Sequence, residues 1–535
     1  MAPAAVQLVN EMIAADVEDH VSDIKKMDFH ESVLNFCSNQ CSKTSSTFSN
    51  IISSIKSTSE LISDATAGLK YETMRFIQDK QIDKKDAESL LQKFDDYGNF
   101  MRNLDTKYKL LTFFKENRRY LEPTSIVLGT RYEQKIKNGI PLQVLKSDKC
   151  QYISIVDMLT HIVSMDGFSD LLEEYKLTKT TRDHCLRSIH DGLYYFGNSI
   201  FTSLDTIVIE LYIDEMELVN PLGSHTGVHK LGFVYFTIKD LPVSLQSSLD
   251  SIFIVNIHYA LDVAKYGYEK ILAPVITDLK FLFDEGITFG EKNYKVVLWQ
   301  VSGDNLGLNK LLGLVESFSA NYCCRFCVVH KHAMHTMTQE ESGLLRTKDL
   351  HDQHVQEAAD TSSIVLGVKG SCPFNDLNYW HSTDNLVVDI VHDLFEGWCG
   401  TEVLLLLNTF IFDGLLTLST LNDRIVNFNY SKCESRCKPG PFQQDRIVNI
   451  GSTGQNATQM WTLIRILPLL IGDKIPQGNK FWDLFLLMLT IVDTLVAPVI
   501  SLAETFQLAE NISDHHKFFL ELFPLRYLTP KMHFA

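Results

Sequence analysis

Two aspartates stand near the ends of predicted β-strands, where carboxylates can hold metal ions. The apolar run TIVIELYIDEM (206–216) reaches Asp214, and the run YKVVLWQVSGDNLG (294–307) reaches Asp304. If both strands lie in one sheet, the carboxylates converge at one edge and repel each other, and a divalent cation such as Mg²⁺ relieves that repulsion. Two such cations could activate a nucleophile and stabilise a leaving oxygen at phosphorus. On spacing alone, a turn or cap role is the more common one for such an Asp.

Cys324 and Cys327 form a second candidate site, because a Cys-x-x-Cys pair presents two thiolates to a tetrahedral zinc ion. A complete site needs two further ligands. The histidines that follow closely enough to supply them are His330, His332 and His335. His533 could instead arrive from far along the chain. A redox pair and two inert buried thiols are the alternatives to zinc.

His392 and Glu396 form a third candidate pair, since residues four apart lie on one face of a helix. They could bind a metal or form a structural hydrogen bond, and the sequence leaves both open. The remaining close cysteine pairs lack a matching second half and are interpreted as packing residues: Cys37 with Cys41, and Cys433 with Cys437. The sequence shows no P-loop, dinucleotide-binding glycine fingerprint or nucleophile elbow.

The elements that must position these residues change along the chain. Residues 1–120 carry apolar side chains at helical spacing. Residues 204–305 contain four runs typical of strands, with a helical pattern over 268–286 before the last run, which predicts a mixed α/β sheet. The segment 308–320 is predicted to be helical and 338–370 to be a polar loop. The chain beyond is largely helical and very apolar.

The composition is that of a globular protein, with 45% apolar and 21% charged residues, so a mostly disordered chain is excluded. The chain has 49 basic and 66 acidic residues and a net charge of −17, which excludes a wholly basic nucleic-acid coat protein. DNA binding depends on local clusters of charge. From Arg102 to Arg187 there are 15 Lys/Arg and 11 Asp/Glu, a net charge of +4, so this segment is a candidate nucleic-acid face. A solvated mixed surface is the alternative.

The cysteines and the apolar stretches indicate the compartment. An odd count of 11 cysteines in a long chain is typical of an intracellular protein with reduced thiols. Two stretches, 401–418 and 481–503, resemble membrane helices, but acidic residues interrupt both. Charges are costly in the centre of a bilayer, so we interpret both stretches as buried helices and expect no membrane contact.

Five blocks of the sequence carry a family resemblance. LYIDEMELVNPLGSHTGVHKLGFVYFTIKDLP (211–242) contains Tyr-x-Asp, Asn-Pro-Leu-Gly and His-Lys-Leu-Gly, and VSGDNLGLNKLLGLVESFSANYCCRFC (301–327) contains Gly-Asp-Asn-x-Gly and Cys-Arg-x-Cys. The other blocks are 265–287, VVDIVHDLFEGW (387–398) and LRYLTPKMHF (525–534). Together they resemble the CACTA (En/Spm-like) DDE transposases, over roughly residues 120–535.

The resemblance implies an α+β fold, with an RNase H-like mixed sheet interrupted by a large all-helical insertion and preceded by a helical N-terminal region. It implies DNA strand cleavage and transfer with Mg²⁺ or Mn²⁺. Asp214 and Asp304 fall on the first two catalytic carboxylates of the family. Cys324 and Cys327 fall on its zinc-binding pair, and His533 falls on the first of a later His pair.

The chain also departs from the family pattern. The resemblance implies a second zinc His shortly after His533 and a catalytic Glu roughly twenty residues later, whereas this chain stops at Ala535. A C-terminally truncated member of the family is therefore expected, and Glu396 is the in-chain substitute for the third carboxylate. The expected segments are 1–120 (helical N-terminal region), 121–203 (mostly helical connection with DNA contact), 204–330 (catalytic core with the Cys-x-x-Cys pair) and 331–535 (helical insertion, truncated).

The resemblance predicts a nuclear, transposase-derived protein that binds transposon ends and target DNA as a homo-oligomer, with catalytic Mg²⁺ or Mn²⁺ and structural Zn²⁺. One alternative is a catalytically inactive remnant that only binds DNA or protein, and the missing Glu favours it. Another alternative is a helical scaffold protein with an incidental α/β domain, which would bind neither zinc nor DNA.

Overall fold

The computed structural model describes residues 29–43, 46–137, 140–179, 183–217 and 230–534. The chain divides into two compact units, Met1–Glu122 and Pro123–Ala535. The Asn-Pro-Leu-Gly part of the family-like motif falls within residues 218–229 and lies outside the described residues.

The described part of the first unit is helical. Its elements are α2 (Phe29–Cys41), α3 (Phe48–Asp79), α4 (Lys84–Asn99), η1 (Phe100–Asn103) and α5 (Lys107–Glu116). A small apolar core joins α2, the beginning of α3 and α5, and Cys37 lies inside it. Burial raises the pKa of the Cys37 thiol to about 12, which suits a packing role for this cysteine.

The second unit is built around a seven-stranded mixed sheet with the order β1-β2-β6-β5-β4-β8-β7. Its strands are β1 (Thr124–Lys137), β2 (Ile140–Tyr152), β4 (Thr206–Glu217), β5 (Lys230–Ile238), β6 (Phe253–Tyr259), β7 (Ile287–Phe289) and β8 (Lys292–Gly303). Strands β3 (Cys185–Leu186) and β9 (Ile500–Ser501) form a separate pair. Together with the helices, the seven-stranded mixed sheet confirms the predicted α+β class.

The central strands form because their sequences are rich in β-branched and apolar residues. Strand β4 runs antiparallel to β5 and parallel to β8. Along β4, Leu211 and Ile213 are buried while Glu210, Tyr212 and Asp214 on the opposite face are less so, the alternation expected of a strand.

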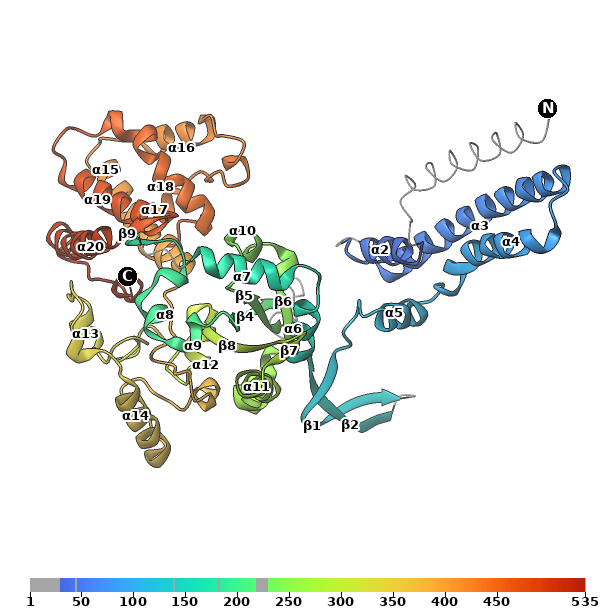
Figure 1. The fold of residues 1–535 in the computed structure, drawn as a ribbon. Coiled ribbons are helices and arrows are strands. Elements are labelled where there is room, and N and C mark those ends of the chain that lie inside the picture. The colour runs from blue at the N-terminus through green and yellow to red at the C-terminus, as the bar shows by residue number, and fades with distance from the viewer. Residues whose placement is uncertain (1–28, 44–45, 138–139, 180–182, 218–229, 535) are drawn as a thin grey trace. The chain divides into compact units, whose positions relative to one another are not determined.

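One face of the sheet is covered by α11 (Ala260–Asp284), which contacts β5, β6 and β8 (Figure 1). Its buried side chains recur at three-to-four spacing, from Ile271 and Leu272 to Leu279 and Leu282. The helix kinks at Gly267, whose φ of 76° is accessible mainly to glycine. The helix covers residues 268–284 of the pattern predicted over 268–286 and begins earlier, at Ala260.

The segment 121–203 differs from the prediction of a mostly helical connection. It begins with the long β1–β2 hairpin, paired from Thr124 with Tyr152 to Lys137 with Ile140. Only Gln151 and Tyr152 of β2 pair with β6, so the hairpin extends beyond the rest of the sheet (Figure 1). The helices that follow are α6 (Ile155–Val163), α7 (Phe168–Thr178), α8 (Leu193–Gly197) and α9 (Ser199–Thr202).

Two further predictions were wrong. The predicted helix over 308–320 ends early, because α12 (Asn305–Leu311) stops before Gly313, where φ is +68° and the chain pairs with the backbone near Gly367. The predicted loop over 338–370 contains α14 (Lys348–Thr361), capped by Thr347. Its buried side chains are His351, His354 and Ala358, so histidines supply the helical period that apolar residues usually provide.

The C-terminal half of the second unit is a helical body with its own apolar core. Its elements are η6 (a π-helix, Ile390–Cys399), α15 (Gly400–Phe412), α16 (Leu418–Asn427), α17 (Gln444–Asn449), α18 (Ala457–Ile471), α19 (Lys480–Leu495), α20 (Leu502–Leu522) and α21 (Pro530–His533). The short helices α10 (Val243–Gln246) and α13 (Lys331–Met334) lie outside it in sequence.

One helical run of the described residues, Ile390–Phe412, is long and apolar enough to cross a membrane. In the structure 72% of its apolar window is buried inside the protein. Core helices of globular proteins also meet this criterion of length and hydropathy, so we interpret the run as part of the helical core.

Candidate functional site

Asp214 and Asp304 lie where the pairing of two adjacent parallel strands ends. In the pairing of β4 with β8 the last partners are Ile213 and Gly303. Asp214 is the next residue of β4, which continues to Glu217, and Asp304 follows the last residue of β8. The two carboxylates therefore leave the sheet at the same edge. Gly303 permits this close pairing, because a Cβ at its position would lie 2.7 Å from the carbonyl oxygen of Ile213.

Each of these carboxylates uses one oxygen locally. Asp304 caps α12, and its Oδ1 accepts a hydrogen bond from the Gly307 N–H at 2.6 Å. The Oδ1 of Asp214 accepts from the Glu215 N–H at 2.7 Å. Within the described residues, the Oδ2 atom of each makes no hydrogen bond to the protein. The cap role and a ligand role are therefore compatible.

The charges of Asp214 and Asp304 act on the same neighbours. Burial raises the pKa of Tyr212 to about 12, and both aspartates contribute to the increase. The pKa of Lys230 is raised chiefly by its hydrogen bond to Glu215, and both aspartates contribute again. The raised pKa values of Tyr212 and Lys230 thus both indicate negative charge at this sheet edge, where a cation would be favoured.

Glu396 does not complete a three-carboxylate group with this pair. It is exposed on η6, and within the described residues no cluster of three carboxylates has its ligand atoms within 4.8 Å of one another. A catalytic role for Glu396 stays a prediction. The neighbouring His392 contacts Asp389 through Nδ1, and Asp389 caps the π-helix. The alternative role for His392, a structural hydrogen bond, therefore has a partner other than Glu396.

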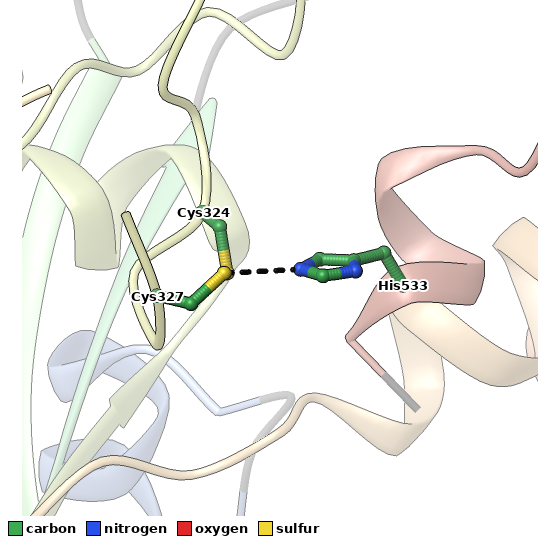
Figure 2. Close-up of side chains that lie close together, drawn as sticks. All are labelled: Cys324, Cys327 and His533. Atoms are coloured by element: carbon green, nitrogen blue, oxygen red, sulfur yellow. Dashed lines mark hydrogen bonds between the residues drawn. The ribbon is translucent and has the colours of Figure 1, made fainter. Parts of the chain in front are cut away.

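Cys324, Cys327 and His533 form the only group of three potential metal ligands that the structure shows among its described residues. Their ligand atoms all lie within 4.8 Å of one another, and the Cys327 Sγ is 3.2 Å from the His533 Nε2 (Figure 2). His533 comes from α21, far along the chain, whereas the cysteines belong to a turn (Figure 2). That turn is held by antiparallel pairing of Cys327 with Leu345.

Both thiols are buried, and together they favour one thiolate. The pKa of Cys324 is lowered to about 4, first by a hydrogen bond with Cys327 and further by His533, in opposition to burial. The pKa of Cys327 is raised because Cys324 takes the negative charge and because the thiol is buried. Metal ions bind the thiolate form, so this environment suits a metal site.

The local histidines do not join this group. The side chain of His330 caps α13, and the ring of His335 stacks on Tyr527 with centroids 4.1 Å apart. His332 is exposed. Of the two sources of further ligands that the sequence offered, the structure brings the distant His533 to the thiols, which gives three of the four ligands of a tetrahedral site. The cluster borders a cavity of about 650 Å³.

A buried polar chain fixes the position of α21. Glu402 is 0% exposed, and it accepts a hydrogen bond from the Trp398 Nε1–H at 2.8 Å and contacts His515 Nε2 at 2.9 Å. The Nδ1 of His515 in turn lies 3.2 Å from the Nδ1 of His516. The Nε2 of His516 is 3.1 Å from the carbonyl oxygen of Met532. The residue next to His533 is thereby tied to the helical core.

The structure also reveals three polar residues to which the sequence analysis assigned no role: Asn305, Arg325 and Asp393. They are buried and bonded to one another between the carboxylate edge and the Cys/His cluster. Each stands inside a block quoted for the family resemblance, next to Asp304, between the two cysteines, or beside His392. That adjacency was the available signal, but only the tertiary structure shows that they meet.

No model of a known protein family matches this chain, and no curated protein matches it.

Proposed function

We propose that this chain derives from a DDE transposase of the CACTA (En/Spm-like) type and binds DNA. Its ancestral reaction is metal-dependent DNA strand cleavage and transfer. The observation that carries the proposal is the position of Asp214 and Asp304 directly after the last paired residues of parallel strands β4 and β8.

The topology supports an RNase H-like assignment for the sheet. The strands β4, β5 and β6 form an antiparallel meander, α11 follows, and β8 then pairs in parallel with β4. The first carboxylate lies on β4, between β5 and β8, and the second directly follows β8, the parallel neighbour of β4. Such strand ends are where open mixed sheets commonly place their functional groups.

The residues present fit a divalent cation at the sheet edge. Asp214 and Asp304 would hold Mg²⁺ or Mn²⁺, since these ions prefer carboxylate oxygens. When bound, the cation supplies activation of a water or hydroxyl nucleophile and stabilisation of charge at phosphorus. The protein's own contribution is to bring the backbones that carry the two carboxylates together through the close pairing of Ile213 with Gly303.

The second metal is zinc in a structural role. Cys324, Cys327 and His533 fit three of its four ligand positions by donor type and proximity, and both thiols are buried. It would join the turn after α12 to the last described helix, and so tie the helical insertion to the sheet.

DNA would be held by basic side chains near the carboxylate edge and along the β1–β2 hairpin. Lys135 and Lys149 of the hairpin are exposed, and they belong to the segment whose net charge is positive. Action on transposon ends and target DNA as a homo-oligomer in the nucleus belongs to the same proposal.

The direct test is nicking of a supercoiled plasmid by the full chain with Mg²⁺ or Mn²⁺. Asp304→Asn should abolish nicking and leave the fold unchanged by circular dichroism. Asp205→Asn is the matched control, since Asp205 is exposed just before the opposite end of β4. Equal nicking by wild type and Asp304→Asn would overturn the assignment of the carboxylate pair.

A second candidate function is a catalytically inactive remnant that binds DNA or protein. It is favoured because, among the described residues, no third carboxylate joins Asp214 and Asp304 in a group whose ligand atoms lie within 4.8 Å of one another. It predicts DNA binding that weakens as salt rises, without metal-dependent nicking. Gel-shift titrations at several salt concentrations, run beside the nicking assay, separate the two candidates.

A further inference from the structure

We infer that Arg325 is a positioning residue that couples the Cys/His metal cluster to Asp304. The inference rests on the proposed function, because it assumes that Asp214 and Asp304 hold a divalent cation. Its physical basis is a chain of buried hydrogen bonds that starts between the two cysteines and ends on the residue next to Asp304.

The buried hydrogen bonds of Arg325 and Asp393 meet at Asn305, the first residue of α12. Its Oδ1 accepts a hydrogen bond from the Arg325 Nη1 at 2.5 Å, and its Nδ2 donates to the Asp393 Oδ1 at 2.6 Å. Arg325 and Asp393 also form an ion pair, with 3.7 Å between the Arg325 Nη2 and the Asp393 Oδ2. Both functional groups of Asn305 are therefore engaged, and its backbone continues directly from Asp304, so the network fixes the turn that aims the Asp304 carboxylate.

Arg325 is equally constrained at the cluster. It lies between Cys324 and Cys327 in sequence, and its side chain is 1% exposed. Its guanidinium carbon lies 5.1 Å from the ring centroid of Phe326 and 5.1 Å from that of Phe534, which follows His533. Closing the cluster around an ion would fix both rings, and thus the guanidinium between them.

A lysine could not replace this guanidinium. Arginine presents a planar fork whose nitrogens reach Asn305, Asp393 and the Val387 carbonyl oxygen, the last at 3.3 Å. Lysine keeps the charge but offers one ammonium group, so it cannot span these acceptors from one position. Arg325→Lys should therefore preserve charge while releasing Asn305.

A second buried arginine provides a matched control. Arg346 donates from Nε to the Cys324 carbonyl oxygen at 3.1 Å and from Nη2 to the Leu366 carbonyl oxygen at 2.7 Å. It supports the same cysteine turn, but none of its hydrogen bonds reaches Asn305. Arg346→Lys thus perturbs the turn without cutting the proposed link.

The test measures Mn²⁺ binding to the full chain by electron paramagnetic resonance, with the cluster loaded with Co²⁺ or stripped by a chelator. Mn²⁺ prefers oxygen ligands, and thiolate-to-Co²⁺ absorption reports the cluster independently. In wild type we expect Mn²⁺ to bind about tenfold more tightly in the loaded protein. In Co²⁺-loaded Arg325→Lys, the Co²⁺ spectrum should remain while Mn²⁺ affinity falls about tenfold. Loaded Arg346→Lys should bind Mn²⁺ as wild type does.

The possible outcomes are distinguishable. Equal Mn²⁺ affinity in loaded wild type and loaded Arg325→Lys would overturn the coupling and leave the carboxylate site intact. An equal loss in Arg325→Lys and Arg346→Lys would also overturn it, because a general loosening of the turn would then explain the result. Mn²⁺ binding that Asp304→Asn does not weaken would overturn the proposed function itself, and the coupling with it.

Discussion

Two buried histidines should make the second unit sensitive to mild acid. His258 on β6 is 1% exposed and His351 on α14 is 2% exposed. Burial lowers the pKa of each from 6.5 to about 4. At His258, Glu215 opposes this shift and Lys310 adds to it. At His351, Arg346 adds to the shift and Asp352 opposes it. Each side chain therefore folds in its neutral form. In the unfolded chain both would titrate near their ordinary pKa.

The sign and size of the change in unfolding free energy with pH follow from proton linkage. Between pH 6.5 and 4 the unfolded chain binds protons at His258 and His351 that the folded chain does not bind, so stability falls as pH falls. From pH 7 to pH 5 each histidine should cost about 2 kcal/mol of unfolding free energy, and the pair about 4 kcal/mol. Above pH 7 neither should contribute to the pH dependence.

The assay is urea unfolding at pH 7, 6 and 5, followed by tryptophan fluorescence. All five tryptophans lie in the second unit, so the signal reports that unit alone. In His258→Gln/His351→Gln the stability loss between pH 7 and 5 should shrink by about 4 kcal/mol. His332→Gln is the control, since His332 is exposed. An unchanged pH dependence in the double variant would refute the reasoning.

Three further predictions concern the packing and the metal cluster. Gly303→Ala should destabilise the unit by about 1–3 kcal/mol and weaken Mn²⁺ binding, because the new methyl group meets the Ile213 carbonyl oxygen; urea unfolding and paramagnetic resonance check both. Glu402→Leu should cost about 2–4 kcal/mol in urea unfolding, because two buried side-chain partners lose their acceptor. Cys324→Ser should remove one equivalent of zinc by mass spectrometry, whereas Cys323→Ser, adjacent but outside the cluster, should retain it; zinc retained by both variants would contradict the site.

The local sequence was sufficient where one element buries one face. The runs over 206–216 and 294–307 are rich in apolar, β-branched residues, which was enough to predict β4 and β8. Most of these apolar side chains are buried in the structure. It failed where polar residues supply the helical period, as in α14 with its buried histidines. It also failed at the β1–β2 hairpin, where Tyr132, Ile136 and Leu145 in the distal part are exposed and the buried alternation is confined to the part near Cys150 and Tyr152.

The sequence alone determined which residues could do chemistry in this protein: the carboxylates Asp214 and Asp304 at strand ends, and the thiols of Cys324 and Cys327. Residue type and spacing are local properties, so they can be read from the chain. Only the tertiary structure decided that His533, rather than a nearby histidine, meets the thiols, and that Arg325 meets Asn305. Those contacts join residues distant in sequence, and they depend on the packing of the helical core against the sheet, which no local pattern encodes.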